Sequence, residues 1–206
     1  MNQVSEFLST MTNKLIAITL VVYILVEALY ANHLSGLELV SWHFQQHRWY
    51  QFVTYMFLHG GPLHLFFNMF ALWMFGRPIE QALGARRFLW FYLLCGIGAG
   101  LISMLIDEYI LQEVYRGVMV GASGAIYGLL VAFALMFPNF KIMLIFLPVP
   151  VAAKYFVPVL LLIDLTAGFT GVSIFGQNIA HFAHIGGAVI GLVLIEFYRR
   201  QSRRSR

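Results

Sequence analysis

Six long apolar segments follow one another along the 206 residues of this chain, and they restrict what it can fold into. A helix needs about 20 predominantly apolar residues to cross the hydrocarbon core of a bilayer. The pattern predicts one all-α domain with six transmembrane helices, the fifth being the weakest because Asp164 interrupts it. The expected spans are 14–31, 62–79, 88–106, 120–137, 155–169 and 178–198.

The composition excludes a soluble domain. Hydrophobic residues make up 60% of the chain and charged residues only 11%, whereas soluble domains carry roughly 25% charged residues. A soluble fold of this size would lack the polar side chains to cover its surface. The single cysteine, Cys95, lies inside an apolar run. This excludes a disulfide framework and indicates a packing role.

The basic residues predict how the chain is oriented. If the N-terminus is cytoplasmic, 11 of the 13 lysines and arginines lie on cytoplasmic segments, and only Arg48 and Arg116 lie opposite. This distribution follows the positive-inside rule and predicts that both termini are cytoplasmic. Residues 199–206 form a basic tail directly after the last span. We expect this tail to contact membrane lipids rather than nucleic acid.

The segment between the first two spans, residues 33–58, mixes aromatic and polar side chains. Tryptophan and tyrosine favour the boundary between lipid and water, so this segment is expected to lie in the membrane interface. Its aromatic residues are Trp42, Phe44, Trp49, Tyr50, Phe52, Tyr55 and Phe57, together with His43.

Polar side chains in the second span form the first candidate group of site residues. Polar groups at membrane depth are costly and usually face a protein interior or a cavity. His64 and Asn68 lie four residues apart and therefore share one face of a helix. Both can donate hydrogen bonds, and we expect them to stabilise a developing negative charge. His59 precedes the helix and is expected to brace its loop.

The fourth span opens on a cluster of small residues around Ser123. Gly121 and Gly124 leave the hydroxyl accessible, and unpaired N–H groups at a helix start favour an oxyanion. Tyr127 follows one turn later on the same face. Gly124 and Gly128 also match a motif for helix packing, and this segment alone favours that alternative.

The last span carries His184 on the same face as Gly187 and Gly191. Glycines at this spacing allow a second helix to approach closely. We expect that helix to be the fourth span, which would bring His184 towards Ser123. A neutral histidine can take a serine proton and return it to a leaving amine. All three groups lie near the predicted non-cytoplasmic ends of their spans.

The order and spacing of these motifs resemble the rhomboid family of intramembrane serine proteases, over residues from about 50 to 191. Residues 80–88 also resemble the family's segment between the second and third spans. The matching motifs are H-x4-H-x3-N at His59, His64 and Asn68, G-x-S-G at Gly121 to Gly124 followed by Tyr127, and H-x2-G-x3-G at His184, Gly187 and Gly191.

The resemblance implies a rhomboid-like fold and a catalytic dyad of Ser123 and His184, without a carboxylate. It also implies an oxyanion hole from His64, Asn68 and the Ser123 N–H, with Tyr127 stacked on His184. The implied reaction is hydrolysis of transmembrane protein substrates near the non-cytoplasmic membrane surface, with no cofactor and no metal. The expected location is the plasma membrane of a bacterium.

The chain departs from the family in its first loop. Many members carry Trp-Arg eight residues before the first motif histidine, where this chain has Tyr50 and Gln51. The bracing of this loop is therefore open. Asp164 is expected to be a polar packing partner or a group near the surface, not a catalytic residue. The loop 168–178 is expected to move as a lid for substrate entry.

Two other functions are open. A catalytically inactive rhomboid-like binder of membrane clients would use the same fold, although such proteins typically lack the serine or the histidine. A transporter or metal site could use His59, His64, His181 and His184. No acidic or thiol ligand joins those histidines in the sequence pattern, and Ser123 would then have no role.

Overall fold

The computed structural model describes residues 7–29, 36–39, 48–110, 118–144, 147–171 and 180–204. The prediction of a mainly helical fold is confirmed, and each long helix overlaps one expected span with bounds that differ by a few residues. Residues 30–31 and 178–179 of the expected spans lie outside the described residues. The long helices are α2 (Met11–Leu29), α4 (Pro62–Leu83), α5 (Ala85–Tyr109), α6 (Ser123–Met136), α7 (Ala153–Thr170) and α8 (His181–Arg204).

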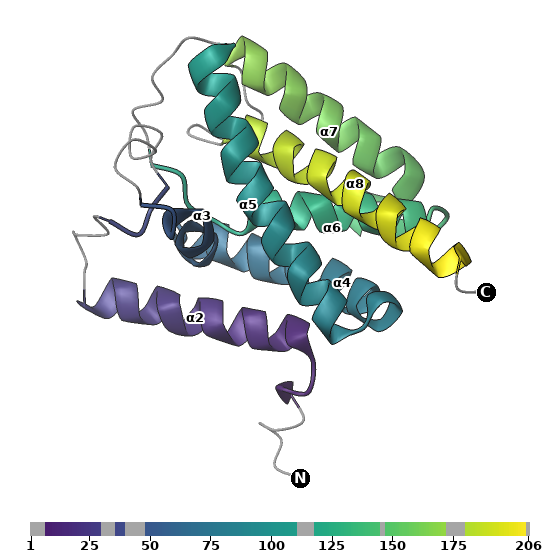
Figure 1. Cartoon of the computed structure of the whole chain (residues 1–206), viewed down its shortest axis with the longest axis horizontal. Helices are drawn as coiled ribbons and strands as arrows, with labels where there is room; N and C mark the ends of the chain where they lie inside the picture. Colours follow the sequence, from purple (N-terminus) through teal and green to yellow (C-terminus); the bar gives the residue numbers. More distant parts are fainter. Residues whose placement is uncertain are drawn as a thin grey trace.

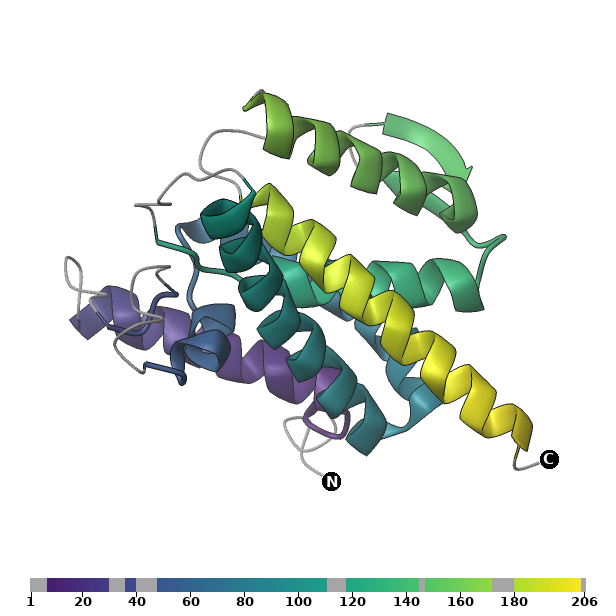
Figure 2. The ribbon, with the colours of Figure 1, turned by 45° about the horizontal axis from the view of Figure 1, so that its top comes forward.

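The long helices alternate in direction. Figure 1 shows α2, α5 and α7 running one way and α4, α6 and α8 running the other, so α2 begins on the side where α8 ends. Helix α6 is central and contacts α4, α5, α7 and α8. Helix α7 lies on the outside of the bundle (Figure 2). The helix that begins with Ser123 is therefore surrounded by protein.

Three described helices, α5, α7 and α8, are both long and apolar enough to cross a membrane. Helices α2 and α6 contribute shorter apolar stretches, Met11–Val26 and Ser123–Met136. The count of six spans therefore stays a prediction. Helix α7 qualifies by its length and composition although it contains Asp164, and this residue is only 1% exposed.

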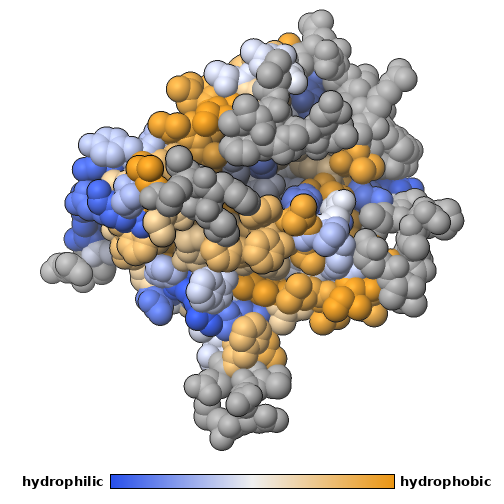
Figure 3. Space-filling model, turned by 180° about the vertical axis from the view of Figure 1, so that it is seen from behind, coloured by the Kyte–Doolittle hydropathy of each residue, from blue (hydrophilic) through white to orange (hydrophobic). Residues whose placement is uncertain are grey.

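The surface of the bundle is strongly apolar. Figure 3 shows broad apolar areas on one face, with many of the hydrophilic side chains on the side where α8 ends. Exposed large apolar side chains occur on five of the long helices, for example Ile24, Phe66, Trp90, Val159 and Val193. A continuous apolar surface of this kind marks contact with lipid. The protein is therefore an integral membrane protein.

The glycine faces of α6 and α8 touch. A Cβ atom added to Gly187 would lie 1.8 Å from the carbonyl oxygen of Gly124. One added to Gly191 would lie 2.6 Å from the Cα atom of Gly128. Only glycine permits so close an approach of two helices. The predicted contact between these faces is confirmed, and it sets the level of α8 along α6.

Helix α4 caps the start of α2 through Glu80, which lies far away in the sequence. The Glu80 carboxylate accepts hydrogen bonds from the backbone N–H groups of Met11 and Thr12, at 2.7 and 2.8 Å. The Thr12 hydroxyl donates to the same carboxylate at 2.7 Å. These bonds satisfy N–H groups that have no acceptor within α2. The negative charge also suits the positive end of the helix dipole.

A small hairpin departs from the all-α expectation. Strands β1 (Lys141–Leu144) and β2 (Leu147–Ala152) pair antiparallel, with Lys141 opposite Ala152. Pro148 and Pro150 lack the N–H that a helix interior needs, and valines alternate with them. The segment between α6 and α7 therefore takes an extended form.

The first loop is braced by hydrogen bonds from α3 (Gln51–Thr54). The Gln51 side chain is 1% exposed, and its amide nitrogen donates to the Gly36 carbonyl at 3.1 Å. The Thr54 hydroxyl donates to the Leu37 carbonyl at 2.6 Å. Leu39 then pairs with Met119, just before α6. Gln51 thus holds the loop in place at the position where the chain departs from the family pattern.

Two aromatic residues of this loop do not lie at the surface of the protein, and the interfacial location of the loop stays a prediction. Phe52 and Tyr55 are buried in the core of the bundle, and the 3₁₀ turn Tyr55–Phe57 leads into the loop before α4. Trp49 and Tyr50 are about half exposed, as an interfacial location requires. Trp42, His43 and Phe44 lie outside the described residues.

Helix α8 continues beyond the expected end of the last span to Arg204, so the basic residues within 199–204 belong to the helix. Where the membrane span itself ends stays a prediction. Arg199 pairs with Glu196 one turn earlier, at 2.8 Å. Arginine is a good helix former, and the basic residues lie at the end of α8 where the helix dipole favours them.

Candidate active site

Ser123 is the first residue of α6, and its N–H therefore has no helical acceptor. The chain enters this helix through Gly121, which has a φ of 120° and donates its N–H to the Tyr55 carbonyl at 2.9 Å. A Cβ atom on Gly121 would lie 2.8 Å from the His64 imidazole. Glycine is required here both by the backbone conformation and by the space.

Ser123 and His184 are hydrogen-bonded to each other. The distance between the Ser123 Oγ and the His184 Nε2 is 2.8 Å. His184 is the fourth residue of α8 and is 9% exposed. The Tyr127 ring stacks on the His184 ring, with 4.2 Å between centroids and 10° between planes. The structure thus brings together three side chains that the sequence predicted to meet.

Asp164 of α7 joins this group from the other side of the imidazole. Its Oδ1 lies 3.1 Å from the His184 Nδ1 and 2.6 Å from the His181 Nδ1. The Tyr127 hydroxyl donates to the second carboxylate oxygen, Oδ2. Of the two alternatives expected for Asp164, the structure shows the polar packing partner, because the side chain is 1% exposed.

Three of these residues also form the one grouping of possible metal ligands found among the described residues: Asp164, His181 and His184. Their donor atoms lie within 4.8 Å of one another. Two ligands bound tetrahedrally to zinc, each about 2.0–2.2 Å from it, lie roughly 3.3–3.6 Å apart. The contacts of Asp164 with His181 and His184, at 2.6 and 3.1 Å, are shorter and match hydrogen bonds. A hydrogen-bonded network is the better description of this cluster.

His64 and Asn68 lie on the α4 side of the site. The Asn68 amide donates to the His64 carbonyl at 2.9 Å, and the His64 Nδ1 accepts from the Gly60 N–H at 3.3 Å. Among the described residues, neither side chain hydrogen-bonds to Ser123. The His64 ring instead lies beside Gly121, two residues before Ser123 in the sequence. One of the two Asn68 amide hydrogens is used by the bond to His64.

His59 packs behind His64, in the loop that precedes α4. The two imidazole rings meet edge to face with 5.1 Å between centroids, and His59 is 5% exposed. Burial lowers the pKa of His59 to about 4, and the nearby His64 contributes in the same direction. The backbone of Phe57 acts in the opposite direction. His59 is therefore neutral at physiological pH, as a packed bracing residue should be.

The sequence analysis missed the contribution of Asp164 and His181. His181 lies three residues before His184, almost one helical turn away, and that spacing is the signal that could have paired them. The predicted lid contains Gly171, which ends α7 with a φ of 69°. Residues 172–178 of that lid lie outside the described residues.

A serine hydrogen-bonded to a buried histidine, inside a bundle of apolar helices, defines a helical membrane protein with a hydrolase-like polar site. The sequence profile of the Rhomboid domain matches residues 46–201, which is more than half of the chain. The chain therefore belongs to the rhomboid family.

Curated proteins similar to this chain include two bacterial ones and one from a plant. They are Rhomboid protease AarA of Providencia stuartii (31% identical), Rhomboid protease GluP of Bacillus subtilis (strain 168) (33%) and Rhomboid-like protein 11, chloroplastic, of Arabidopsis thaliana (35%). Each alignment covers 71% of this chain, and they cover 54%, 25% and 51% of those proteins respectively. The chain thus spans about half or less of the length of these relatives.

Proposed function

We propose that this chain is an intramembrane serine endopeptidase that hydrolyses peptide bonds of transmembrane protein substrates, with Ser123 as nucleophile and His184 as general base. The observation that carries the proposal is the 2.8 Å contact between the Ser123 Oγ and the His184 Nε2. Membership of the rhomboid family supports the class of reaction, since two similar proteins carry the name Rhomboid protease.

The reaction proceeds through an acyl-enzyme. The Ser123 oxygen attacks the scissile carbonyl carbon while its proton moves to the His184 Nε2. The protonated imidazole then gives this proton to the leaving amine as the C–N bond breaks. A water molecule then gives a proton to His184 and attacks the ester carbonyl. As the ester bond breaks, His184 returns this proton to the Ser123 oxygen, which releases the new carboxyl end and restores the serine hydroxyl. Stacking of Tyr127 on the imidazole keeps the ring in line with Ser123 throughout.

The oxyanion of the tetrahedral intermediate is stabilised by the Ser123 N–H, His64 and Asn68. Ser123 begins α6, so its N–H is free to donate and lies at the positive end of the helix dipole. The second Asn68 amide hydrogen and the His64 Nε2 supply the side-chain donors. His64 already contacts Gly121 at the start of this helix.

The membrane orientation belongs to the same proposal. Both termini lie on the cytoplasmic side, residues 199–206 meet anionic lipid headgroups, and the site opens to the opposite side, where water is available. The relatives do not single out a compartment, since their names include chloroplastic and mitochondrial proteins beside the bacterial ones. The bacterial plasma membrane therefore stays a prediction.

Cleavage of a model single-span substrate by the purified protein in liposomes tests the proposal. We expect the wild-type chain to cut it and Ser123→Ala to leave it intact, while a fluorophosphonate probe labels wild-type protein only. Equal cleavage by both proteins would remove Ser123 from the reaction.

The alternative is a catalytically inactive rhomboid-like binder of membrane clients. It would retain the substrate on the protein without cutting it, for wild type and Ser123→Ala alike. It would also leave Ser123 unlabelled by the probe, because an inert serine does not react with fluorophosphonates. The hydrogen bond of Ser123 to His184 favours the protease over this alternative.

A further inference from the structure

Asp164 is an acidic side chain inside an apolar helix, and its burial needs an explanation. A carboxylate taken out of water is costly unless hydrogen bonds satisfy it. The structure supplies three partners: His181 and His184 on Oδ1, and the Tyr127 hydroxyl on Oδ2. Two of these partners touch the proposed reaction, since His184 bonds to Ser123 and Tyr127 stacks on His184.

The Asp164 carboxylate accepts all three hydrogen bonds. An ionised carboxylate can only accept, so the His184 Nδ1 must carry the proton that lies between it and Asp164. A neutral imidazole with a proton on Nδ1 has a free lone pair on Nε2. That lone pair lies 2.8 Å from the Ser123 oxygen, where it can accept the hydroxyl proton. Asp164 therefore fixes the tautomer that a general base needs.

We propose that Asp164 is a positioning residue that extends the Ser123–His184 pair to a Ser–His–Asp triad, where the resemblance to the family implies a dyad. The inference rests on the proposed protease function. Asp164 holds the His184 ring and stabilises the imidazolium that forms when Ser123 attacks. His181 and Tyr127 hold the carboxylate itself, each by one hydrogen bond.

Asp164→Asn is the sharpest substitution, because it keeps the shape and removes the charge. The neutral amide no longer stabilises the imidazolium and can hold His184 in the wrong tautomer. We expect kcat on the single-span substrate to fall by about 10²–10⁴-fold, with KM changed far less. Asp164→Glu, which restores a carboxylate, should recover part of that loss. Asp107→Asn is the control for the loss of a buried acid, since Asp107 is also buried in a long helix, α5.

The outcomes separate this inference from the proposed function. If wild type cleaves and Ser123→Ala does not, but Asp164→Asn keeps the wild-type kcat, the triad is wrong and the protease stands. If wild type itself does not cleave, the proposed function fails first. Because Asp164→Asn can impair folding, nitrogen NMR of histidine-labelled wild-type protein is a second measurement. A neutral His184 protonated on Nδ1 supports the triad, and protonation on Nε2 overturns it.

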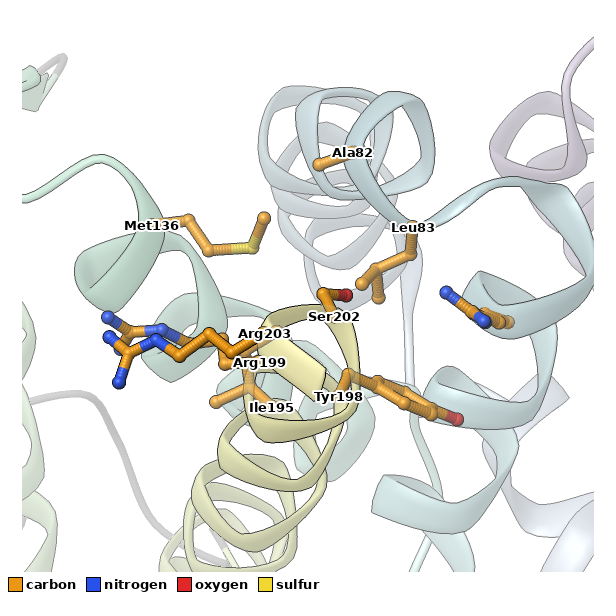
Figure 4. A pocket seen from close by; sticks show the side chains of 9 residues that line it. Ala82, Leu83, Met136, Ile195, Tyr198, Arg199, Ser202 and Arg203 are labelled. Atoms are coloured by element: carbon orange, nitrogen blue, oxygen red, sulfur yellow. The ribbon is translucent and has the colours of Figure 1, made fainter. Parts of the chain in front are cut away.

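A second observation, independent of the protease function, concerns the end of the bundle where α4 and α6 finish. A cavity of about 260 Å³ lies there between these helices, the start of α5 and the end of α8. Three arginines line it: Arg87, Arg199 and Arg203. Figure 4 shows the side chains of Arg199 and Arg203 extending side by side from α8, with the Ser202 hydroxyl turned towards Leu83.

The positive charge of the three arginines favours the binding of an anion in this cavity. Arg199 and Arg203 lie four residues apart on one helix, a spacing at which like charges repel. Glu196 neutralises Arg199, and no acidic residue lines the cavity itself. Arginine binds phosphate oxygens in pairs, and serine adds a further donor. Leu83 and Ile195 add apolar side chains to the lining of the cavity.

We infer that this cavity binds a phosphate group, carried either by an anionic phospholipid or by free phosphate. The test compares thermal unfolding of the full chain in phosphatidylglycerol vesicles, in phosphatidylcholine vesicles, and in phosphatidylcholine with added inorganic phosphate. A phospholipid site raises Tm in phosphatidylglycerol only, whereas a free-phosphate site also raises it with added phosphate. Equal Tm values in all three overturn the inference.

The arginines are tested as a pair. We expect the double variant Arg199→Gln and Arg203→Gln to lose the rise in Tm. Arg86→Gln is the matched control, because Arg86 is exposed at the same end of the molecule but does not line the cavity. If Arg86→Gln loses the rise in Tm equally, the rise depends only on the net charge of the protein, and a specific site is overturned.

Discussion

Asn68 lies one helical turn after His64 on α4, and the residue is 6% exposed. It donates one hydrogen to the His64 carbonyl and keeps one for a developing oxyanion. We predict that Asn68→Ala lowers turnover of the single-span substrate by about 10²–10³-fold, because one oxyanion donor is lost. Asn139→Ala, in the exposed turn after α6, should leave turnover unchanged. Wild-type turnover in Asn68→Ala would exclude Asn68 from the oxyanion hole.

His59 predicts how stability depends on pH. Burial, with a contribution from His64, lowers its folded pKa to about 4, whereas an unfolded histidine titrates near 6.5. Below about pH 6.5 the unfolded chain therefore takes up a proton that the folded chain does not. His59 therefore contributes fully to the free energy of unfolding above about pH 6.5. As the pH falls towards 4, the free energy of unfolding decreases by as much as roughly 3 kcal/mol.

The change that tests this is His59→Phe, which cannot titrate. We expect its Tm to fall less than that of wild type when the pH is lowered from about 7.5 to about 5. The comparison at the higher pH is the control, since His59 is neutral in both states there. An identical acid response in the two proteins would show that His59 titrates normally.

At the scale of the helices, the α6–α8 contact is the most sensitive feature. Gly187→Ala would place a methyl group 1.8 Å from the Gly124 carbonyl oxygen, so the two helices must separate. We predict a loss of stability of about 1–3 kcal/mol and a larger proportional loss of activity, because Ser123 and His184 belong to these helices. Thermal unfolding and cleavage assays measure both.

The matched control for that substitution is Val189→Ala, on the same helix but 46% exposed and facing outward. It should lower neither quantity appreciably. Activity and Tm that survive in Gly187→Ala would mean that α8 can shift without disturbing the site.

The cap that α4 provides for α2 leads to a second prediction for the helices. Glu80→Ala removes charge-assisted hydrogen bonds to Met11 and Thr12, each worth about 1.5–3 kcal/mol. We expect a lower Tm and earlier proteolysis near the start of α2, with the Ser123–His184 contact intact. Glu108→Ala, at the exposed end of α5, is the control. Equal Tm values in the two variants would contradict a capping role.

At the scale of the whole molecule, the proposed orientation can be measured with single cysteines. Cys95 is fully buried, so it should give little background labelling. We predict that Leu37→Cys reacts with an impermeant thiol reagent from the non-cytoplasmic side only, and Asn139→Cys from the cytoplasmic side only. Both positions are exposed in the structure. Labelling of both from one side would contradict the alternation of the helices across the membrane.

Much of the fold and the central pair of the site could be predicted from the sequence, for a physical reason. The glycines beside Ser123 and His184 record which faces of α6 and α8 must touch, so two distant segments could be matched. No comparable sequence pattern marks the partners of Asp164. Lipid and protein interior are both apolar, so a membrane helix shows little contrast between its faces, and the rotation of α7 could not be read.

Other contacts were missed because they join remote residues without a local pattern. Glu80 binds Thr12 at the start of α2, although the two lie 68 residues apart in the sequence. No pattern around either residue indicates this contact. The hairpin was missed because most of its residues are apolar and it lies between two expected spans. Its two prolines, Pro148 and Pro150, were the signal that could have identified it.

The members of the buried network are not equally anchored. Ser123 and Tyr127 sit on α6 and His184 on α8, two helices whose backbones touch, whereas Asp164 alone comes from the peripheral helix α7 (Figure 2). An outward displacement of α7 by about 1 Å would break the contact of Asp164 with His184 and leave the contact of Ser123 with His184 in place. The thickness and lateral pressure of the surrounding lipid, which act on α7 directly, would then adjust the strength of the base from outside the protein.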